Sequence, residues 1–192
     1  MTVASTMRYV IMGTGGIGGF FGGKLAMSGE DVWFVARGKH LEAMKNHGLQ
    51  VKSTTGDFIV PPGTMTDDVA SVGHADAVLF CVKSFDTESA ARALSPILHD
   101  DSLVISLQNG IDNEEKIQKQ IARGHVYGGV AYISSRITAP GVVSEVGGFQ
   151  RMVFGPPNSA INARAQDVHE SLVRAGIKSE LQVDVTKERW KK

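Results

Sequence analysis

Short apolar, β-branched runs alternate along this chain with longer segments whose apolar positions recur at helical spacing. That order winds a parallel sheet with helices on both of its faces. The sequence predicts strands over residues 9–12, 32–36, 77–82, 103–107 and 126–133. It predicts helices over residues 16–28, 39–46, 87–98 and 113–122, each with a turn signal at one end.

The pattern changes at a turn sequence, Thr-Ala-Pro-Gly at 138–141. Two short apolar runs follow, over 142–146 and 151–154, and they resemble an antiparallel extension of the sheet. A helix over 159–175 and a last strand over 178–183 form one further unit. The predicted fold class is therefore α/β, a Rossmann-like, doubly wound and mostly parallel sheet with an antiparallel extension after about residue 138.

Residues 184–192 look like the start of another helix, with Asp184 or Thr186 as its N-cap. The sequence ends after about two turns, and a helix this short is marginal by itself in water. We therefore expect one domain over residues 1–183 and the beginning of a further element over 184–192.

Composition and charge narrow the classes of function. The 192 residues carry 20 basic and 20 acidic side chains, so the chain lacks the basic excess that nucleic-acid binding requires. No apolar run approaches the roughly 20 residues that span a bilayer, so we expect no membrane segment. A single cysteine, Cys81, excludes an internal disulfide and predicts a reducing, cytoplasmic environment. The six histidines form no pair at i, i+4, and we expect no metal site.

A glycine-rich loop carries the first candidate chemistry. Gly13, Gly15 and Gly18 form G-x-G-x-x-G directly after a predicted strand and at the start of a predicted helix. The first glycine permits a tight turn, the second lets backbone amides approach a pyrophosphate, and the third lets helix and strand pack closely. We therefore expect a dinucleotide to bind at Gly13, Thr14, Gly15, Gly16, Ile17 and Gly18. The alternative is a packing turn without a ligand.

A second phosphate-binding pattern overlaps this loop but is incomplete. Gly18, Gly23 and Lys24 have the spacing of an NTPase loop, yet Leu25 occupies the position where that loop needs a hydroxyl for magnesium. These residues also fall inside the predicted helix, so the sequence argues against an NTPase.

The end of the second strand indicates which dinucleotide is bound. Folds that prefer NAD place Asp or Glu there to accept from a ribose hydroxyl, and residues 32–41 contain neither. Arg37 stands there instead, with Lys39 close behind, and a guanidinium can bind a 2′-phosphate through two hydrogen bonds. NADP(H) is therefore the predicted cofactor. The alternative is that both side chains belong to a solvated turn.

Polar residues also follow two later strands, at the edge where open parallel sheets bind ligands. Lys83 follows the strand over 77–82 and suits a carboxylate or phosphate. Asn109 follows the strand over 103–107 and can both donate and accept hydrogen bonds. Because Asn-Gly is also a common turn pair, a purely structural role for Asn109 stays open.

Taken together, these residues resemble the 2-dehydropantoate 2-reductases, also called ketopantoate reductases, over almost the whole chain. The resemblance rests on these stretches: the loop 13–18, Arg37, Val82-Lys83-Ser84, Gln108-Asn109-Gly110, 128–141 from Gly128-Gly129-Val130 to Pro140-Gly141, Phe154-Gly155-Pro156 and Trp190-Lys191-Lys192. It implies NADPH-dependent reduction of ketopantoate to pantoate by hydride transfer, a step of pantothenate and coenzyme A biosynthesis.

The resemblance also assigns roles to residues. It implies that Arg37 takes the 2′-phosphate, that Lys83 and Asn109 line the cofactor and substrate site, and that Lys192 is the catalytic lysine of a W-x-K element, with Lys191 as the alternative. It implies a helical C-terminal domain, which residues 184–192 would begin, and a homodimer formed through it. Two other functions stay open, an NADP-dependent dehydrogenase of another 2-oxo acid and a non-catalytic NADP(H)-sensing module.

Overall fold

The computed structural model describes residues 6–157 and 160–190. Its strands are β1 (Arg8–Met12), β2 (Asp31–Val35), β3 (Leu49–Lys52), β4 (Phe58–Val60), β5 (Met65–Thr66), β6 (Ala77–Phe80), β7 (Leu103–Ser106), β8 (His125–Ala139), β9 (Val142–Gly155) and β10 (Lys178–Leu181). Its helices are α1 (Gly16–Met27), α2 (Gly38–His47), α3 (Thr87–Ala93), α4 (Asn113–Gln118), α5 (Ala163–Arg174) and α6 (Thr186–Trp190), with 3₁₀ turns η1 (Val69–Val72) and η2 (Ser84–Asp86).

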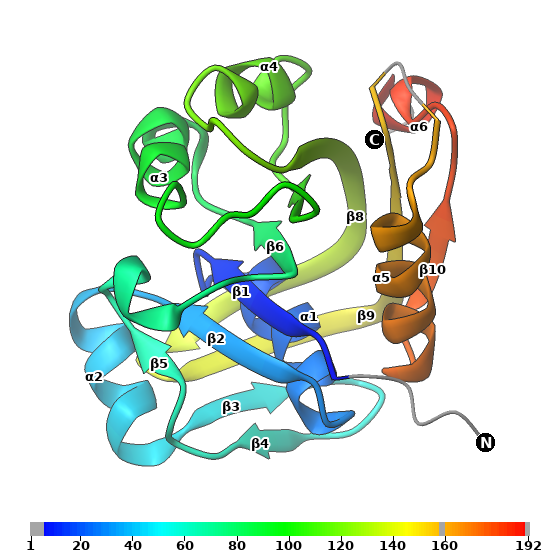
Figure 1. Cartoon of the computed structure of the whole chain (residues 1–192). Coiled ribbons are helices and arrows are strands. Elements are labelled where there is room, and N and C mark those ends of the chain that lie inside the picture. The colour runs from blue at the N-terminus through cyan, green and yellow to red at the C-terminus, as the bar shows by residue number, and fades with distance from the viewer. Residues whose placement is uncertain (1–5, 158–159, 191–192) are drawn as a thin grey trace.

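All of these strands join one sheet, in the order β4-β3-β9-β8-β7-β6-β1-β2-β5, with β10 beside β9 (Figure 1). Within this order, the six consecutive strands β8-β7-β6-β1-β2-β5 run parallel to one another. β9 then runs antiparallel to β8, while β3 and β10 pair parallel with different parts of β9. The predicted α/β class, a Rossmann-like sheet with an antiparallel extension, is confirmed.

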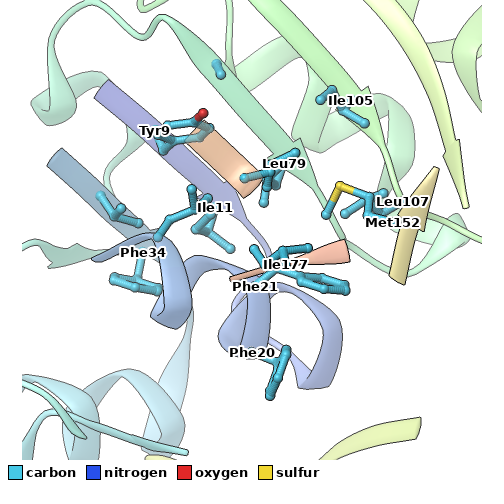
Figure 2. Close-up of a cluster of buried hydrophobic side chains, with 14 of the residues drawn as sticks. Tyr9, Ile11, Phe20, Phe21, Phe34, Leu79, Ile105, Leu107, Met152 and Ile177 are labelled. Carbon is cyan, nitrogen blue, oxygen red and sulfur yellow. The ribbon is translucent and has the colours of Figure 1, made fainter. Parts of the chain in front are cut away.

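Side chains alternate between the two faces of the sheet and build a core on each. On β1, Tyr9 and Ile11 face the core that α1, α2 and α5 cover, and Val10 and Met12 face the core under α3, α4 and η1. Figure 2 shows side chains of the first core, among them Ile11 of β1 and Phe20 and Phe21 of α1. Because strands buried on both faces need apolar residues at successive positions, the predicted strand segments read as continuous apolar runs.

The structure corrects the boundaries of several predicted elements. The runs over 126–133, 142–146 and 151–154 belong to two long strands, β8 and β9, which form one hairpin around Pro140 and Gly141. Much of the hairpin is exposed and polar, so its strands are not continuous apolar runs in the sequence. Two register shifts interrupt the pairing of β8 with β9 as well. The helices predicted over 87–98 and 113–122 end early, at Ala93 and Gln118, where i→i−3 hydrogen bonds follow.

Three short strands, β3, β4 and β5, were not predicted. Each has four residues or fewer, and the turn at Ser53–Asp57 separates the first two. They depend on neighbours that are distant in the sequence, since β3 pairs with β9 and β5 pairs with β2. The helix predicted from Ser159 begins at Ala163, and Ser159 lies outside the described residues.

Candidate functional site

A pocket of about 250 Å³ opens at the carboxyl ends of β1, β2 and β6. Three loops that are far apart in the sequence meet there because these strands are neighbours and parallel. The lining residues are Met12, Gly13, Thr14, Gly15, Val35, Ala36, Arg37, His40, Cys81, Val82, Lys83, Asp86 and Ile137. The pocket thus brings together Gly13, Thr14, Gly15, Arg37 and Lys83, five of the residues that the sequence nominated.

The three motif glycines have different surroundings. Gly13 has φ +99°, and a Cβ there would lie 2.9 Å from the amide nitrogen of Val82. At Gly18 a Cβ would lie 2.8 Å from Cγ2 of Ile11 and would press on the carbonyl oxygen of Gly13. At Gly15 a Cβ would meet no protein atom within 4 Å. Gly13 and Gly18 therefore serve the fold, whereas the open space beside Gly15 is where a ligand can approach the backbone.

The N-terminus of α1 adds amide donors at this point. Gly15 is its N-cap and gives no side-chain cap, and the first turn holds no acidic residue. The first amides of a helix, here those of Gly16, Ile17 and Gly18, have no intrahelical acceptor. None of these three residues lines the pocket itself, and Gly16 packs closely on the backbone of Ser135. Such an uncapped terminus attracts an anion.

Thr14 fixes the loop to the neighbouring strand. Its amide and its hydroxyl both donate to the carbonyl oxygen of Val35, at 2.9 and 3.0 Å. Its side chain is buried and committed to β2. Thr14 therefore sets the distance between the glycine loop and Arg37, which follows β2.

Charged side chains stand at the mouth of the pocket. Arg37 precedes α2, and its side chain is 70% exposed. Lys83 is exposed on the loop after β6. Asp86 follows on the same loop, with Oδ2 4.0 Å from Nη1 of Arg37. Two cations and one carboxylate thus border the site.

His40 is a lining residue that sequence reasoning did not nominate. The amide of Gly141 donates to its Nδ1 at 3.0 Å, so the proton of the neutral ring is on Nε2. Burial lowers the pKa of His40, and the nearby backbone of Thr14 opposes part of that shift. The ring therefore joins α2 to the β8–β9 turn while it lines the pocket.

Cys81 also lines this pocket but carries no nucleophile. Burial raises the pKa of its thiol to about 12, so the thiolate is scarce at neutral pH. Cys81 is therefore a small buried thiol just beyond the end of β6.

Asn109 lies at a second pocket, of about 330 Å³, with Gln108, Gly110, Gly129 and Arg189 among its lining residues. The side chain of Asn109 is exposed. Its backbone carbonyl oxygen accepts a hydrogen bond from Nδ2 of Asn113 at 3.0 Å. Gln108 donates to the carbonyl oxygen of Val82 at 3.0 Å and so joins this loop to the one that carries Lys83.

Helix α6 reaches the second pocket through Arg189, which sequence reasoning also missed. Its guanidinium pairs with Glu114 of α4, and Gly128 leaves the space that the guanidinium fills. Burial raises the pKa of Glu114, and the charge of Arg189 offsets part of that shift. Nearby, Oε2 of Glu188 accepts from the hydroxyl of Tyr132 at 2.8 Å. Lys191 and Lys192, the two candidates for the catalytic lysine, lie outside the described residues.

The residues around the first pocket fit a dinucleotide. A pyrophosphate needs backbone donors with open space beside them, which Gly15 and the start of α1 offer. A 2′-phosphate needs an accessible cation one strand away, which Arg37 offers. Within residues 6–157 and 160–190, no three His, Cys, Asp or Glu side chains gather as a metal site would require. Over the same residues, no helix has the length and apolar character to span a membrane.

Comparisons with known proteins give the family. A family model described as ketopantoate reductase PanE/ApbA matches residues 9–159. The 2-dehydropantoate 2-reductase of Nostoc sp. is 33% identical over 189 residues, covering 96% of this chain and 59% of that protein. The enzyme of the same name from Pyrococcus horikoshii is 34% identical over 186 residues, covering 97% and 60%. A crystal structure of a PanE/ApbA family ketopantoate reductase from Ralstonia eutropha superposes with a TM-score of 0.86 at 33% identity, covering 96% of this chain and 59% of that one. The chain spans about three-fifths of the length of these relatives.

Proposed function

The chain belongs to the ketopantoate reductase PanE/ApbA family, and we propose that it is the cofactor-binding part of an NADPH-dependent 2-dehydropantoate 2-reductase. One observation carries the cofactor assignment: a single pocket joins the glycine loop, the exposed Arg37 and Lys83. In this proposal the start of α1 holds the pyrophosphate, Arg37 holds the 2′-phosphate, and Lys83 and Asn109 face the reacting end of the cofactor and the substrate.

The substrate is a 2-oxo acid, and ketopantoate is the one that the names of the relatives indicate. When bound, the cofactor supplies a hydride to the carbonyl carbon, and negative charge then develops on the carbonyl oxygen. An ammonium near that oxygen stabilises the charge and supplies the proton of the product hydroxyl. We assign this role to Lys192, with Lys191 as the alternative. Support comes from Arg189, three residues before Lys192, which lines the pocket that holds Asn109.

The domain boundary belongs to the same proposal. Residues 1–183 form the NADP(H)-binding domain, and residues 184–192 begin the first helix of a helical domain that supplies further substrate contacts and a homodimer interface. Asp184 supports a helix start here, because its Oδ1 accepts from the amide of Thr186 at 2.8 Å. We expect residues 1–192 to bind NADPH but to reduce ketopantoate poorly, in the cytoplasm of the source cell. Turnover by residues 1–192 at the rate of a full-length relative would refute this.

Binding of NADPH and NADH to Arg37→Gln tests the cofactor assignment. Loss of charge-assisted hydrogen bonds should weaken NADPH binding by roughly 10- to 100-fold. NADH binding should change little, because NADH has no 2′-phosphate. Lys45→Gln is the matched control, since Lys45 is exposed on the same helix but does not line the pocket. Equal loss of both cofactors in Arg37→Gln, or no loss, would refute the assignment.

Turnover separates the reductase from the alternatives. In a longer chain that contains the helical domain, Lys192→Ala should abolish ketopantoate reduction while NADPH still binds. A sensing module would show no turnover before or after the substitution. A dehydrogenase of another 2-oxo acid would show turnover with that acid and little with ketopantoate.

A further inference from the structure

We infer that Asp86 is a specificity-determining residue of the cofactor pocket and that its carboxylate reduces the preference of the site for NADPH over NADH. The inference deepens the proposed function and rests on it, because it takes the 2′-phosphate to lie at Arg37. It concerns the contact between a carboxylate and a guanidinium at the pocket mouth.

The geometry places both charges at the mouth of one pocket. Asp86 and Arg37 line one pocket, and Oδ2 of Asp86 lies 4.0 Å from Nη1 of Arg37. The Asp86 side chain is 35% exposed, and that of Arg37 is 70% exposed. A phosphate that binds the guanidinium from the pocket therefore lies within a few ångströms of the carboxylate.

The Asp86 carboxylate is not committed to another structural task. Asp86 occupies the N-cap position of α3, where an aspartate commonly accepts a hydrogen bond from the first turn. Here its side chain makes no such bond. The charged partner within 4.0 Å that the structure gives it is Arg37, so no hydrogen bond to the helix holds the carboxylate away from the pocket.

The two cofactors respond to this carboxylate in opposite ways. A 2′-phosphate carries between one and two negative charges at neutral pH, so Asp86 repels it and competes with it for Arg37. A ribose hydroxyl can donate to a carboxylate, which is how NAD-binding folds hold the ribose. Arg37 can still bind a phosphate through two hydrogen bonds, so we expect a reduced preference for NADPH and not a reversed one.

Cofactor titrations of residues 1–192 test the inference. Asp86→Asn removes the charge and keeps the shape of the side chain, so NADPH should bind roughly five- to tenfold more tightly. NADH should bind no more tightly than before, so the ratio of the two dissociation constants should shift by the same factor. Glu88→Gln is the matched control: Glu88 is an exposed acid on α3 that contacts Arg92 and does not line the pocket. It should leave the ratio unchanged within about twofold.

Titration with 2′,5′-ADP and 5′-AMP repeats the comparison at the adenosine end alone. Asp86→Asn should favour 2′,5′-ADP by the same factor as it favours NADPH. An unchanged ratio would overturn the inference, and so would weaker NADPH binding, which would mean that Asp86 orients Arg37 for the phosphate. A failure of the proposed function would give a different result. NADPH would then bind equally well to the parent chain and to Arg37→Gln, or would bind to neither.

Discussion

Two alanine substitutions in the glycine loop should separate its structural role from its proposed role in binding. At Gly15 the backbone has φ −88° and ψ −157°, which any residue adopts, and a Cβ would meet no protein atom within 4 Å. At Gly18 a Cβ would lie 2.8 Å from Cγ2 of Ile11 and would press on the Gly13 carbonyl oxygen. The first substitution therefore changes only the space open to a ligand, whereas the second changes the packing of α1 on β1.

The magnitudes follow from these surroundings. Gly15→Ala loses up to about 1 kcal/mol at an N-cap position and regains about 0.4–1 kcal/mol through a less flexible unfolded chain, so the free energy of unfolding should hardly change. Gly18→Ala gains about 1 kcal/mol of helix propensity. Overpacking against Ile11 and a backbone oxygen costs roughly 2–3 kcal/mol, the upper part of the usual range, because the backbone cannot move aside as a flexible side chain can. We expect a net loss of about 1–2 kcal/mol, which lowers Tm by roughly 2–8 °C in a chain of this size.

Thermal unfolding and NADPH titration of both variants give the answer. Gly15→Ala should unfold within about 2 °C of the parent chain and should bind NADPH at least roughly tenfold more weakly, because the new methyl group occupies the approach to the loop. The reasoning is refuted if Gly15→Ala binds NADPH like the parent chain. It is also refuted if Gly15→Ala loses as much stability as Gly18→Ala.

Further predictions concern three polar side chains with long-range partners, Glu145, His40 and Arg189. Glu145 accepts from Ser53, Thr54, Gln150 and the amide of Gly148, so Glu145→Gln should lower the free energy of unfolding by about 1–3 kcal/mol in urea titrations. Burial acts to raise the pKa of Glu145, but these hydrogen bonds outweigh burial and hold the pKa below 4.5. The ionised Glu145 should therefore contribute fully to the free energy of unfolding above pH 4.5. Urea titrations should show this contribution disappear as the pH falls through the pKa of Glu145 in the folded state. Burial lowers the pKa of His40 from 6.5. The neutral ring therefore contributes fully to the free energy of unfolding above pH 6.5, and this contribution is lost as the pH falls from 6.5 toward the pKa of His40 in the folded state. In the same urea titrations, His40→Gln should remove this part of the pH dependence. Arg189→Met leaves Glu114 without its cationic partner and should cost roughly 1–3 kcal/mol in thermal unfolding.

The sequence was sufficient for the parts of the site that the parallel sheet creates. Lys83 and the glycine loop follow adjacent strands, and strands that run parallel deliver the residues after them to the same edge. Arg37 follows β2, the neighbour on the other side of β1. A residue that comes directly after a strand could therefore be placed without knowledge of any side-chain contact.

Residues that reach the site by other routes could not be placed in this way. Asp86 lies six residues beyond the end of β6, and its exposure to the pocket depends on the turn η2 and on a helix cap that it does not form. His40 lines the pocket while bonded to Gly141, which is 101 positions away. Arg189 belongs to a helix whose position depends on Glu114. In each case the position of the side chain depends on a tertiary contact, which a local sequence pattern does not predict.

In the proposed function, the spacing between the pyrophosphate position and the 2′-phosphate position depends on the backbone and not on the charged side chains. Thr14 donates twice to the carbonyl oxygen of Val35, and Arg37 follows Val35 by two residues. The distance from the glycine loop to Arg37 is thus held by hydrogen bonds inside the sheet and by the pairing of β1 with β2. In that proposal Arg37 and Asp86 tune the preference between two cofactors that share a pyrophosphate, because neither side chain is needed to build the glycine loop. The proposal therefore predicts that a change of charge at the pocket mouth is enough to change the cofactor preference, with no change in the fold.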